Sequence, residues 1–551
     1  MELRNLGKVL DTDVLILGSG AAGCCAALAA CEQGSGVLLV DKGKLESSGS
    51  AGGGNDHFMA NLNSGPEWDA DETLVNFFSR TLAGITKDII DKRWVKVIPV
   101  ILRFLEDIGV EYVRNPDGSC VRTVGFGQPG PWWLNIKNGQ LLKRLIAKKL
   151  RSMNVNVLDH VMVTRLLKNG DKVAGAVGFN VVDGNFYILR AKTVVLALGI
   201  EANRATNNST PSPFNVWLYP YNTGSNTVMA YNAGAKIFNL ELTEIATLLP
   251  KGFGCPGMNG LNSMGGHELN AFGERFMSKY DPVFLENTIR RKQVAATYQE
   301  LIDGKGPPFY MDMRHLSSED IDLLQNVLMP GDKATFGDYL KQKEISFATH
   351  PLEVEISELI LGGRILINDR LESTVSGLFS ACNFFALSGA MCGGYSAGIE
   401  AANMVLKIDR LSDIDSNEVI KEKEQVFRPL GKSRGPNPRE FENVIRQVMN
   451  YYMGHVRNQK GIETALEKLN LIERHINYIK ATNYHELMRA NEARHLLKHC
   501  QLSTRAVLER KESGRTIYRR SDYPDSNKEL NKCLVIWQEN GEPKISFESP
   551  L

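Results

Sequence analysis

The sequence predicts an α/β fold built on a parallel sheet, with a second domain inserted into it and a helical domain towards the C-terminal end. Three segments far apart in the chain predict this fold. Residues 13–42 read as strand, glycine-rich turn, helix and strand, residues 191–199 as an apolar strand that ends in glycine, and residues 373–405 as a strand followed by a glycine-rich helix. Strands that alternate with helices are typical of parallel sheets covered by those helices.

Residues 13–42, DVLILGSGAAGCCAALAACEQGSGVLLVDK, contain the most specific motif. Gly18, Gly20 and Gly23 have the spacing required by a tight turn, a close backbone approach to a pyrophosphate and close helix packing. Asp41 ends the second strand about 20 residues later, where a carboxylate binds ribose hydroxyls. The motif therefore predicts a Rossmann-type dinucleotide site with contacts from Gly18, Gly20, Ala22, Gly23, Asp41 and Lys42. It does not separate NAD from FAD, because both adenosine halves are held in this way.

The other two segments favour FAD. In residues 373–405 we expect Gly393, Gly394 and Gly398 to open a helix whose positive end lies beside the electron-rich end of an isoalloxazine ring. The three segments together resemble the FAD-binding frame of the fumarate reductase and succinate dehydrogenase flavoprotein superfamily. The resemblance implies FAD contacts from Ala197, Gly199, Asn383, Gly393, Gly394, Ser396 and Ala397.

The loop after the second strand, LESSGSAGGGN, is expected to reach the flavin with small hydroxyls and backbone amides. We expect contacts from Ser48, Ser50, Gly52, Gly53 and Asn55; the alternative is a flexible loop without a ligand. In many respiratory members of the superfamily a histidine after a serine in this loop carries the flavin covalently, and Gly49 stands about there in this chain. The resemblance therefore implies non-covalent FAD.

The composition is that of an ordinary globular protein. Hydrophobic residues make up 43% of the 551 residues, and 64 basic side chains balance 63 acidic ones. This balance disfavours binding to nucleic acid or to an anionic membrane surface and favours a small-molecule enzyme. The N-terminus has no pattern of a secretory signal and no apolar run is long enough to span a membrane, so we expect a cytoplasmic protein.

The nine cysteines form no CxxC pair and no CxxCxxC run. We therefore expect neither a zinc site nor an iron–sulfur cluster of the chain's own, and we assign no metal ligand. Most of the cysteines are expected to be reduced core thiols.

The chain is too long for one hydrophobic core, and the change of sequence pattern along it predicts three domains. Residues 1–224 and 349–414 are expected to form a discontinuous FAD-binding domain, and residues 225–348 an inserted α+β capping domain. Residues 415–551 contain amphipathic helical patterns, such as REFENVIRQVMNYYMGH, and are expected to form a C-terminal helical domain.

Within the superfamily, the nearer resemblance is to the alpha subunit of dissimilatory adenylylsulfate reductase. Three strings carry it: WLYPYNTGSNTVMAYNAGA from Trp217, LLPKGFGCPG from Leu248 and PWWLNIKNGQLLK from Pro131. The resemblance implies that Trp217 lies near the flavin. Near the C-terminus, Arg510, Glu512, Ser513 and Arg515 stand before a DYP turn as in the superfamily, which extends the resemblance over nearly the whole chain.

The departures from the superfamily fall at substrate-binding positions. Leu248 stands where adenylylsulfate reductases have a substrate-facing arginine, and Gln140 where they have glutamate. The histidine and the arginine of fumarate reductases are missing near Gly362 and near Met391. A dianionic substrate in a dry pocket needs cationic partners, and leucine cannot replace a bidentate arginine. We therefore expect a substrate less charged than adenylylsulfate or fumarate.

Four residues are the candidates for substrate chemistry: Trp217, Lys251, Arg364 and His350. Arg364 would supply the cation missing at Leu248, although a structural arginine is equally ordinary there. Lys251 lies in a glycine turn, where a desolvated ammonium group would act as an acid or bind an anion. A structural role is the alternative for His350, and a place in an apolar pocket wall for Trp217.

The leading hypothesis is an FAD-dependent oxidoreductase subunit that resembles the adenylylsulfate reductase alpha chain. It would carry out two-electron chemistry on a small substrate at N5 of FAD and exchange electrons with a ferredoxin-like iron–sulfur partner, as that family does. A homo-oligomer and a hetero-oligomer are both compatible with the sequence. One alternative is a soluble fumarate-reductase-like or enoate reductase, and another is a non-catalytic paralogue that keeps FAD for electron relay or assembly.

Overall fold

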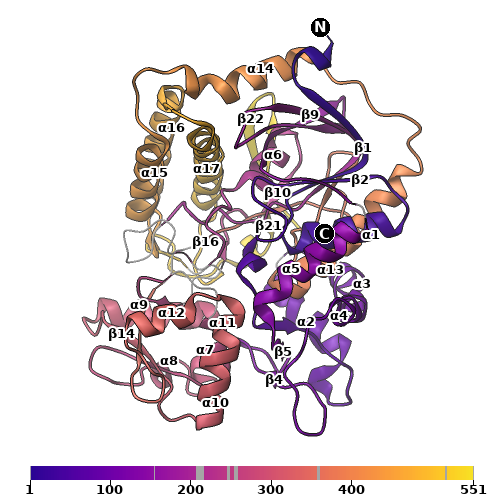
Figure 1. The fold of residues 1–551 in the computed structure, drawn as a ribbon. Coiled ribbons are helices and arrows are strands. Elements are labelled where there is room, and N and C mark those ends of the chain that lie inside the picture. Colours follow the sequence, from indigo (N-terminus) through magenta and orange to yellow (C-terminus); the bar gives the residue numbers. More distant parts are fainter. Residues whose placement is uncertain are drawn as a thin grey trace.

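The computed structural model describes residues 2–82, 84–153, 155–206, 216, 218–244, 248–253, 258–356, 360–515 and 518–549. Figure 1 shows three regions: an α/β domain around β1, β2 and β9, a cap that contains α7 to α12, and a group of helices formed by α15, α16 and α17. The fold class expected from the sequence is confirmed.

The α/β domain is built on a sheet with strand order β6-β2-β1-β9-β8-β7, in which β18 also pairs with β9. Its parallel strands are β1 (Lys8–Leu17), β2 (Val37–Val40), β6 (Asn156–Leu158), β9 (Phe186–Leu196) and β18 (Leu378–Ser380), and β7 (Val161–Asn169) and β8 (Lys172–Asn180) form an antiparallel hairpin. Leu17 pairs with Val40 and with Leu196, so three parallel strands end at the same edge. Ligands bind at this edge in open α/β sheets.

Alternate residues of β1 face opposite sides of the sheet. Val14 and Ile16 pack into the core with helices α1 (Ala21–Glu32), α5 (Leu142–Ser152) and α13 (Ala386–Val405). Leu15 and Leu17 pack into a second core with α6 (Ser225–Asn232) and the strands of a smaller sheet. Because both faces are covered, the strand ends and their loops are what remains for a ligand.

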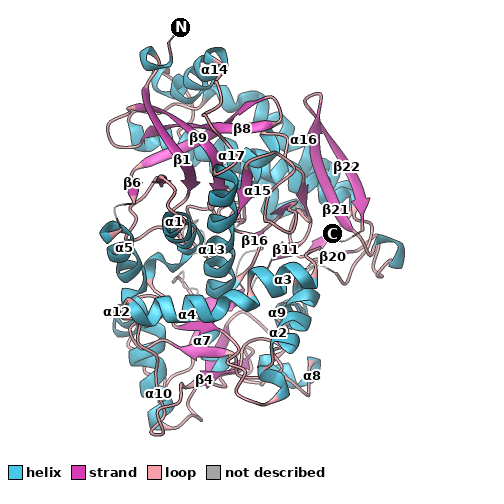
Figure 2. Ribbon diagram, turned by 90° about the vertical axis from the view of Figure 1, so that its right-hand side faces the viewer, coloured by secondary structure: helices cyan, strands magenta, loops and turns pink. Residues whose placement is uncertain are grey.

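Helix α13 packs tightly against α1, and the two helices lie together beneath the sheet in Figure 2. A Cβ atom on Gly394 would lie 2.1 Å from the carbonyl oxygen of Ala22, and one on Gly398 would lie 2.3 Å from that of Ala26. The expectation that Gly393 and Gly394 open this helix was wrong, because α13 begins at Ala386. The glycines lie within the helix, where they permit close helix–helix packing.

The cap has an antiparallel sheet with order β12-β15-β14-β13 and its own hydrophobic core. The sheet contains β12 (Leu248–Pro250), β13 (His267–Leu269), β14 (Phe309–Asp312) and β15 (Leu352–Ile356), and the helices are α7 (Met258–Ser263), α8 (Met277–Tyr280), α9 (Arg290–Ile302), α10 (Ser318–Leu323), α11 (Met329–Asp332) and α12 (Phe336–Gln342). The cap differs at both ends from the expected residues 225–348. β15 follows residue 348 but pairs with β12 of the cap sheet, and α6 follows residue 224 but packs on the α/β domain.

The C-terminal region consists of α14 (Ser416–Phe427), α15 (Pro438–Tyr452), α16 (Gln459–His475) and α17 (Tyr484–Glu509), followed by the hairpin β21 (Cys533–Glu539) and β22 (Glu542–Glu548). β21 pairs with β10 (Ile237–Phe238), and β10 pairs with β17 (Arg364–Ile365). Residues 415–551, expected to form a C-terminal helical domain, thus contain four long helices and end in a hairpin on the α/β domain. Asn540 and Gly541 form its turn, and both residues have positive φ. The Asn-Gly dipeptide is a strong sequence signal of a tight hairpin.

The remaining elements are short or peripheral. They are α2 (Asp71–Thr81), α3 (Lys87–Arg93), α4 (Ile98–Asp107), β3 (His57–Met59), β4 (Arg122–Thr123), β5 (Trp133–Asn135), β11 (Thr243–Glu244), β16 (Ile360–Leu361), β19 (Val456–Arg457) and β20 (Arg519–Arg520). Within the described ranges, each helix is too short or too polar to cross a membrane.

Candidate functional site

The glycine turn between β1 and α1 has the geometry that the motif predicts. Gly18 has φ +99°, and a Cβ atom there would lie 2.4 Å from the carbonyl oxygen of Ala197. A Cβ on Gly23 would lie 1.7 Å from the carbonyl oxygen of Gly18. Gly20 is the N-cap of α1 and provides no side-chain cap, so the first amides of α1 are left for another acceptor. Such a helix N-terminus fits a pyrophosphate.

The loop of residues 47–55, which we call the flavin loop, faces this glycine turn. Gly49 has φ +81°, and a Cβ on it would lie 2.7 Å from Cα of Gly20. A Cβ on Gly52 would lie 2.0 Å from the carbonyl oxygen of Ser47. Ser50 and Gly53 are exposed. The two glycine segments thus approach each other more closely than side chains would allow, as a cradle for a flat cofactor requires.

Asp41, at the end of β2, is fixed by several donors. Its carboxylate accepts hydrogen bonds from the amide and hydroxyl of Ser19 at 2.7 and 3.0 Å, from the amide of Gly43 at 2.7 Å and from the hydroxyl of Ser48 at 2.9 Å. These contacts join the glycine turn to the flavin loop through Asp41. Burial, with a further contribution from the charge of Asp41, raises the pKa of Tyr219. The carboxylate is therefore held at the place where the motif expects the ribose hydroxyls.

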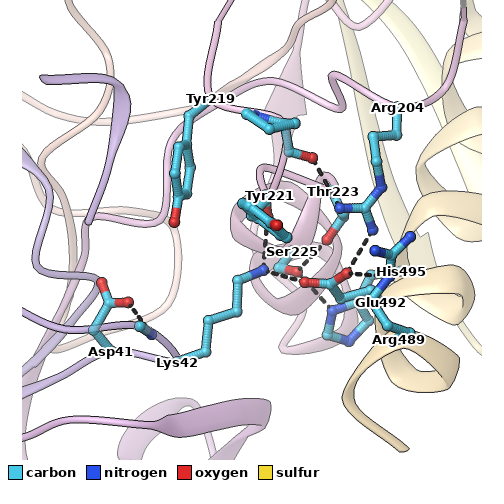
Figure 3. Close-up of polar contacts among 12 residues, drawn as sticks. Asp41, Lys42, Arg204, Tyr219, Tyr221, Thr223, Ser225, Arg489, Glu492 and His495 are labelled. Atoms are coloured by element: carbon cyan, nitrogen blue, oxygen red, sulfur yellow. Dashed lines mark hydrogen bonds and ion pairs between the residues drawn. The ribbon is translucent and has the colours of Figure 1, made fainter. Parts of the chain in front are cut away.

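The side chain of Lys42 points away from Asp41 and towards the C-terminal helices, as Figure 3 shows. Its ammonium group donates to the carbonyl oxygen of Tyr221 and to Glu492 of α17, both at 2.6 Å. Glu492 is fully buried and also accepts from Arg204 at 2.5 Å. Burial opposes ionisation of Glu492, but the charges of Arg204, Lys42 and Arg489 lower its pKa to about 2. A direct contact of Lys42 with FAD stays a prediction.

The network continues into the C-terminal region. Arg204 also pairs with Glu442 of α15 at 3.0 Å, and Glu442 accepts from Arg489 at 2.9 Å. The sequence does not predict these contacts, because charged side chains on amphipathic helices, such as Glu442 and Arg489, are more often solvated. No local signal in the sequence distinguishes the two cases.

The far end of the flavin loop is enclosed by the cap and the start of α5. A Cβ on Gly54 would lie 2.0 Å from the carbonyl oxygen of Gly331, and a Cβ on Gly139 would lie 1.9 Å from that of Asn55. Asp332 of α11 is buried here, and its Oδ2 atom has no hydrogen-bond partner within the described residues. Burial and the nearby charge of Asp56 raise the pKa of Asp332 well above its ordinary value.

The raised pKa of Asp332 predicts a specific pH dependence of stability. The folded state keeps the Asp332 proton above the ordinary pKa of about 3.9, whereas the unfolded state releases it. The free energy of unfolding therefore falls as the pH rises from about 3.9 to the folded-state pKa of Asp332, by up to about 1.4 kcal/mol per pH unit. We expect Asp332→Asn to remove this loss, measured by urea unfolding of both proteins at several pH values.

The exposed Asp338 of α12 offers the matched control. Asp338→Asn is expected to leave the wild-type pH dependence unchanged. Parallel stability curves for the wild type and Asp332→Asn would contradict the assignment of a protonated Asp332.

The candidates for substrate chemistry are not brought together. The side chain of Lys251 is 54% exposed and pairs with Glu353 at 2.5 Å, and this hydrogen bond raises the pKa of Lys251. The expectation of a desolvated ammonium group was therefore wrong, because the turn lies at the cap surface. His350 is also exposed. Arg364 is buried and donates from Nε to the carbonyl oxygen of Asn383 at 3.0 Å. Trp217 lies outside the described residues.

Several expected FAD contacts have structural partners in the fold. The hydroxyl of Ser396 donates to the carbonyl oxygen of Arg93 at 3.0 Å, and the amide of Asn383 donates to that of Ile365 at 2.8 Å. Ala397 is fully buried within α13. A Cβ on Gly393 would lie 2.7 Å from the Phe384 ring, and one on Gly199 would lie 2.4 Å from Nδ2 of Asn222. Contacts of these residues with FAD stay predictions. The described residues hold no group of three or more His, Cys, Asp or Glu side chains suited to a metal ion.

Comparison with known proteins identifies the family. The model of the FAD binding domain family matches residues 13–386, and that of the fumarate reductase flavoprotein C-terminal region matches residues 442–550. An FAD-dependent oxidoreductase of Methanocaldococcus jannaschii is 26% identical, with 96% of each chain covered. A chain of the CoM/CoB fumarate reductase of Methanothermobacter marburgensis is 25% identical, with 96% of this chain and 97% of the relative covered.

Solved structures have the same fold. The adenylylsulfate reductase of Archaeoglobus fulgidus superposes with a TM-score of 0.87 at 23% identity, covering 99% of this chain and 96% of the other. FrdA of the Escherichia coli quinol fumarate reductase superposes with a TM-score of 0.83 at 19% identity, covering 98% and 97%. The expected superfamily and the expected cofactor, FAD, are confirmed. This chain belongs to the FAD-binding flavoprotein family of the fumarate reductases and is an FAD-dependent oxidoreductase.

Proposed function

We propose that this protein is the flavoprotein subunit of a reductase that passes two electrons between FAD and a small substrate and exchanges them with a ferredoxin-like iron–sulfur partner. The observation that carries the proposal is the flavin loop, which lies between the glycine turn and the cap. The names of several relatives support a role in an assembly, since they are flavoprotein subunits of fumarate reductases. We also propose a cytoplasmic location.

FAD supplies two-electron chemistry when it is bound. The residues of this chain would hold and shield it. Asp41 would accept hydrogen bonds from the ribose hydroxyls, and the first amides of α1 would donate to the pyrophosphate. The cap, through Gly331 against Gly54, would exclude water from the far end of the flavin loop.

The substrate is proposed to carry less negative charge than adenylylsulfate or fumarate. Leu248 is 1% exposed and packs in the core of the cap, so its position offers no cation to a ligand. Gln140 is neutral, and its Cα lies 3.1 Å from where a Cβ on Gly54 would stand. Arg364 is the proposed substitute for the missing arginine. Reduction of an activated double bond, as in an enoate reductase, is the second candidate, and it is favoured by the fumarate reductases among the relatives.

Anaerobic electron transfer tests the proposed function. A reduced [4Fe–4S] ferredoxin is mixed with the full-length protein loaded with FAD, and flavin absorbance near 450 nm is followed. We expect the flavin to be bleached and then reoxidised by a monoanionic or neutral unsaturated acid or ester. Reduction of the flavin by dithionite but not by ferredoxin would contradict the proposed ferredoxin-like partner. Reduction by ferredoxin without reoxidation by any such acceptor would favour the electron-relay alternative.

A further inference from the structure

The last residue of the string PWWLNIKNGQLLK, Lys143, has a buried ammonium group that contacts both segments of the cofactor cradle. Lys143, in the first turn of α5, is 1% exposed. Its Nζ donates to the carbonyl oxygen of Leu45 and to the Sγ atom of Cys24, which lies 3.2 Å away. Both acceptors are uncharged, and no carboxylate within the described residues forms an ion pair with Lys143. A buried charge without a charged partner is destabilising by several kcal/mol.

Two acidic residues of the segments around Lys143, Asp41 and Glu46, are engaged with other partners. Asp41 accepts hydrogen bonds from Ser19, Gly43 and Ser48. Glu46 forms an ion pair with Arg151 at 2.7 Å. Within the part of the chain that the structure describes, Lys143 therefore has no carboxylate paired with it.

The two acceptors belong to the segments that form the cofactor cradle. Cys24 lies in the first turn of α1, directly after the glycine turn, and its thiol also donates to the carbonyl oxygen of Ser19 at 3.2 Å. Leu45 begins the stretch that leads to Gly49, and Gly49 contacts Gly20. The buried ammonium group thus joins the two segments.

We propose that Lys143 is a positioning residue for FAD, which fixes these two segments and whose charge is offset by the pyrophosphate. Charges attract over several ångströms in a weakly polarisable interior, so direct contact is not required. The inference depends on FAD binding and is independent of the substrate. The charge of Lys143 therefore has opposite effects in the two states of the protein. It destabilises the apoprotein, and it attracts the pyrophosphate of FAD in the holoprotein.

The test compares Lys143→Met with the wild type in full-length protein, with and without FAD. We expect the Met variant to bind FAD at least tenfold more weakly, by fluorescence quenching, while its apoprotein unfolds at the same or a higher temperature. Lys148→Met, an exposed position on the same helix, is the matched control and is expected to change neither quantity. ADP and adenosine separate the ligand groups: the variant is expected to lose affinity for ADP but not for adenosine.

Two results would overturn the proposal. One is an apoprotein of Lys143→Met that is less stable while its FAD affinity is unchanged, which would make Lys143 a structural clamp only. The other is an equal loss of affinity for ADP and adenosine, which would remove the pyrophosphate from the argument. If the Met variant does not fold, Lys143→Gln gives the same comparison, because it keeps a donor and removes the charge.

Discussion

Gly23→Ala is expected to yield a protein without bound FAD. The new Cβ atom would lie 1.7 Å from the carbonyl oxygen of Gly18 and 3.2 Å from Cβ of Ala197. The closest clash is with a backbone atom of the turn, which cannot rotate away as a side chain could. Helix α1 must therefore move away from β1, and the cradle widens. An added methyl group in a well-packed interior lowers the free energy of unfolding by about 1–3 kcal/mol. Because this methyl group overlaps with backbone, we expect a loss at or above the upper end of that range. We expect at least about a 100-fold loss of FAD affinity, since about 1.4 kcal/mol corresponds to a factor of ten.

The measurement is the ratio of flavin to protein absorbance in the purified variant, followed by titration with FAD. Gly337→Ala in α12 is the control, because nothing lies within 4 Å of a Cβ at that position. It is expected to keep a full complement of flavin. Stoichiometric FAD in Gly23→Ala would show that the turn between β1 and α1 does not hold the cofactor.

Glu492→Ala is expected to have the largest effect on stability. The substitution leaves Arg204 and Lys42 without the carboxylate that joins them, and Arg204 is fully buried. Breaking a buried ion pair by removing one partner is destabilising by about 3–5 kcal/mol. We also expect weaker FAD binding, because Lys42 follows Asp41 directly and loses the partner that orients it.

Urea unfolding monitored by tryptophan fluorescence measures the first effect, and FAD titration the second. Asp88→Ala is the matched control, since Asp88 forms an exposed pair with Lys92 on α3. Exposed pairs contribute about 0–1 kcal/mol. A loss of stability in Glu492→Ala no larger than in this control would contradict the structural role of the network in Figure 3.

The sequence predicts the parts of the site whose geometry is local. Gly18 and Gly23 are needed by a turn that spans a few residues, so their spacing alone identifies the contacts that the structure contains. The start of α13 was misplaced for a related reason. Glycine favours both helix ends and close helix packing, and only the position of α1 shows that Gly394 serves the second purpose.

The residues that the sequence does not reveal act across long distances in the chain. Lys143 and Cys24, or Lys42 and Glu492, are brought together by the tertiary fold, and a buried ion pair has the same local pattern as a solvated one. The exposure of Lys251 likewise depends on where the cap surface lies. The final hairpin was not predicted, although its two strands are joined by Asn540-Gly541, a dipeptide typical of tight hairpin turns.

The most direct test of the proposed substrate class is the visible flavin spectrum of the holoprotein under anaerobic conditions. Sulfite with and without AMP, and then succinate, are added to the oxidised protein, and the flavin is finally reduced with dithionite. We expect no bleaching by either compound and full chemical reduction, because Leu248 lies in the cap core and supplies no cation to a dianionic ligand. Bleaching by sulfite that AMP enhances, or reduction by succinate, would contradict the proposal that the pocket suits a less charged substrate.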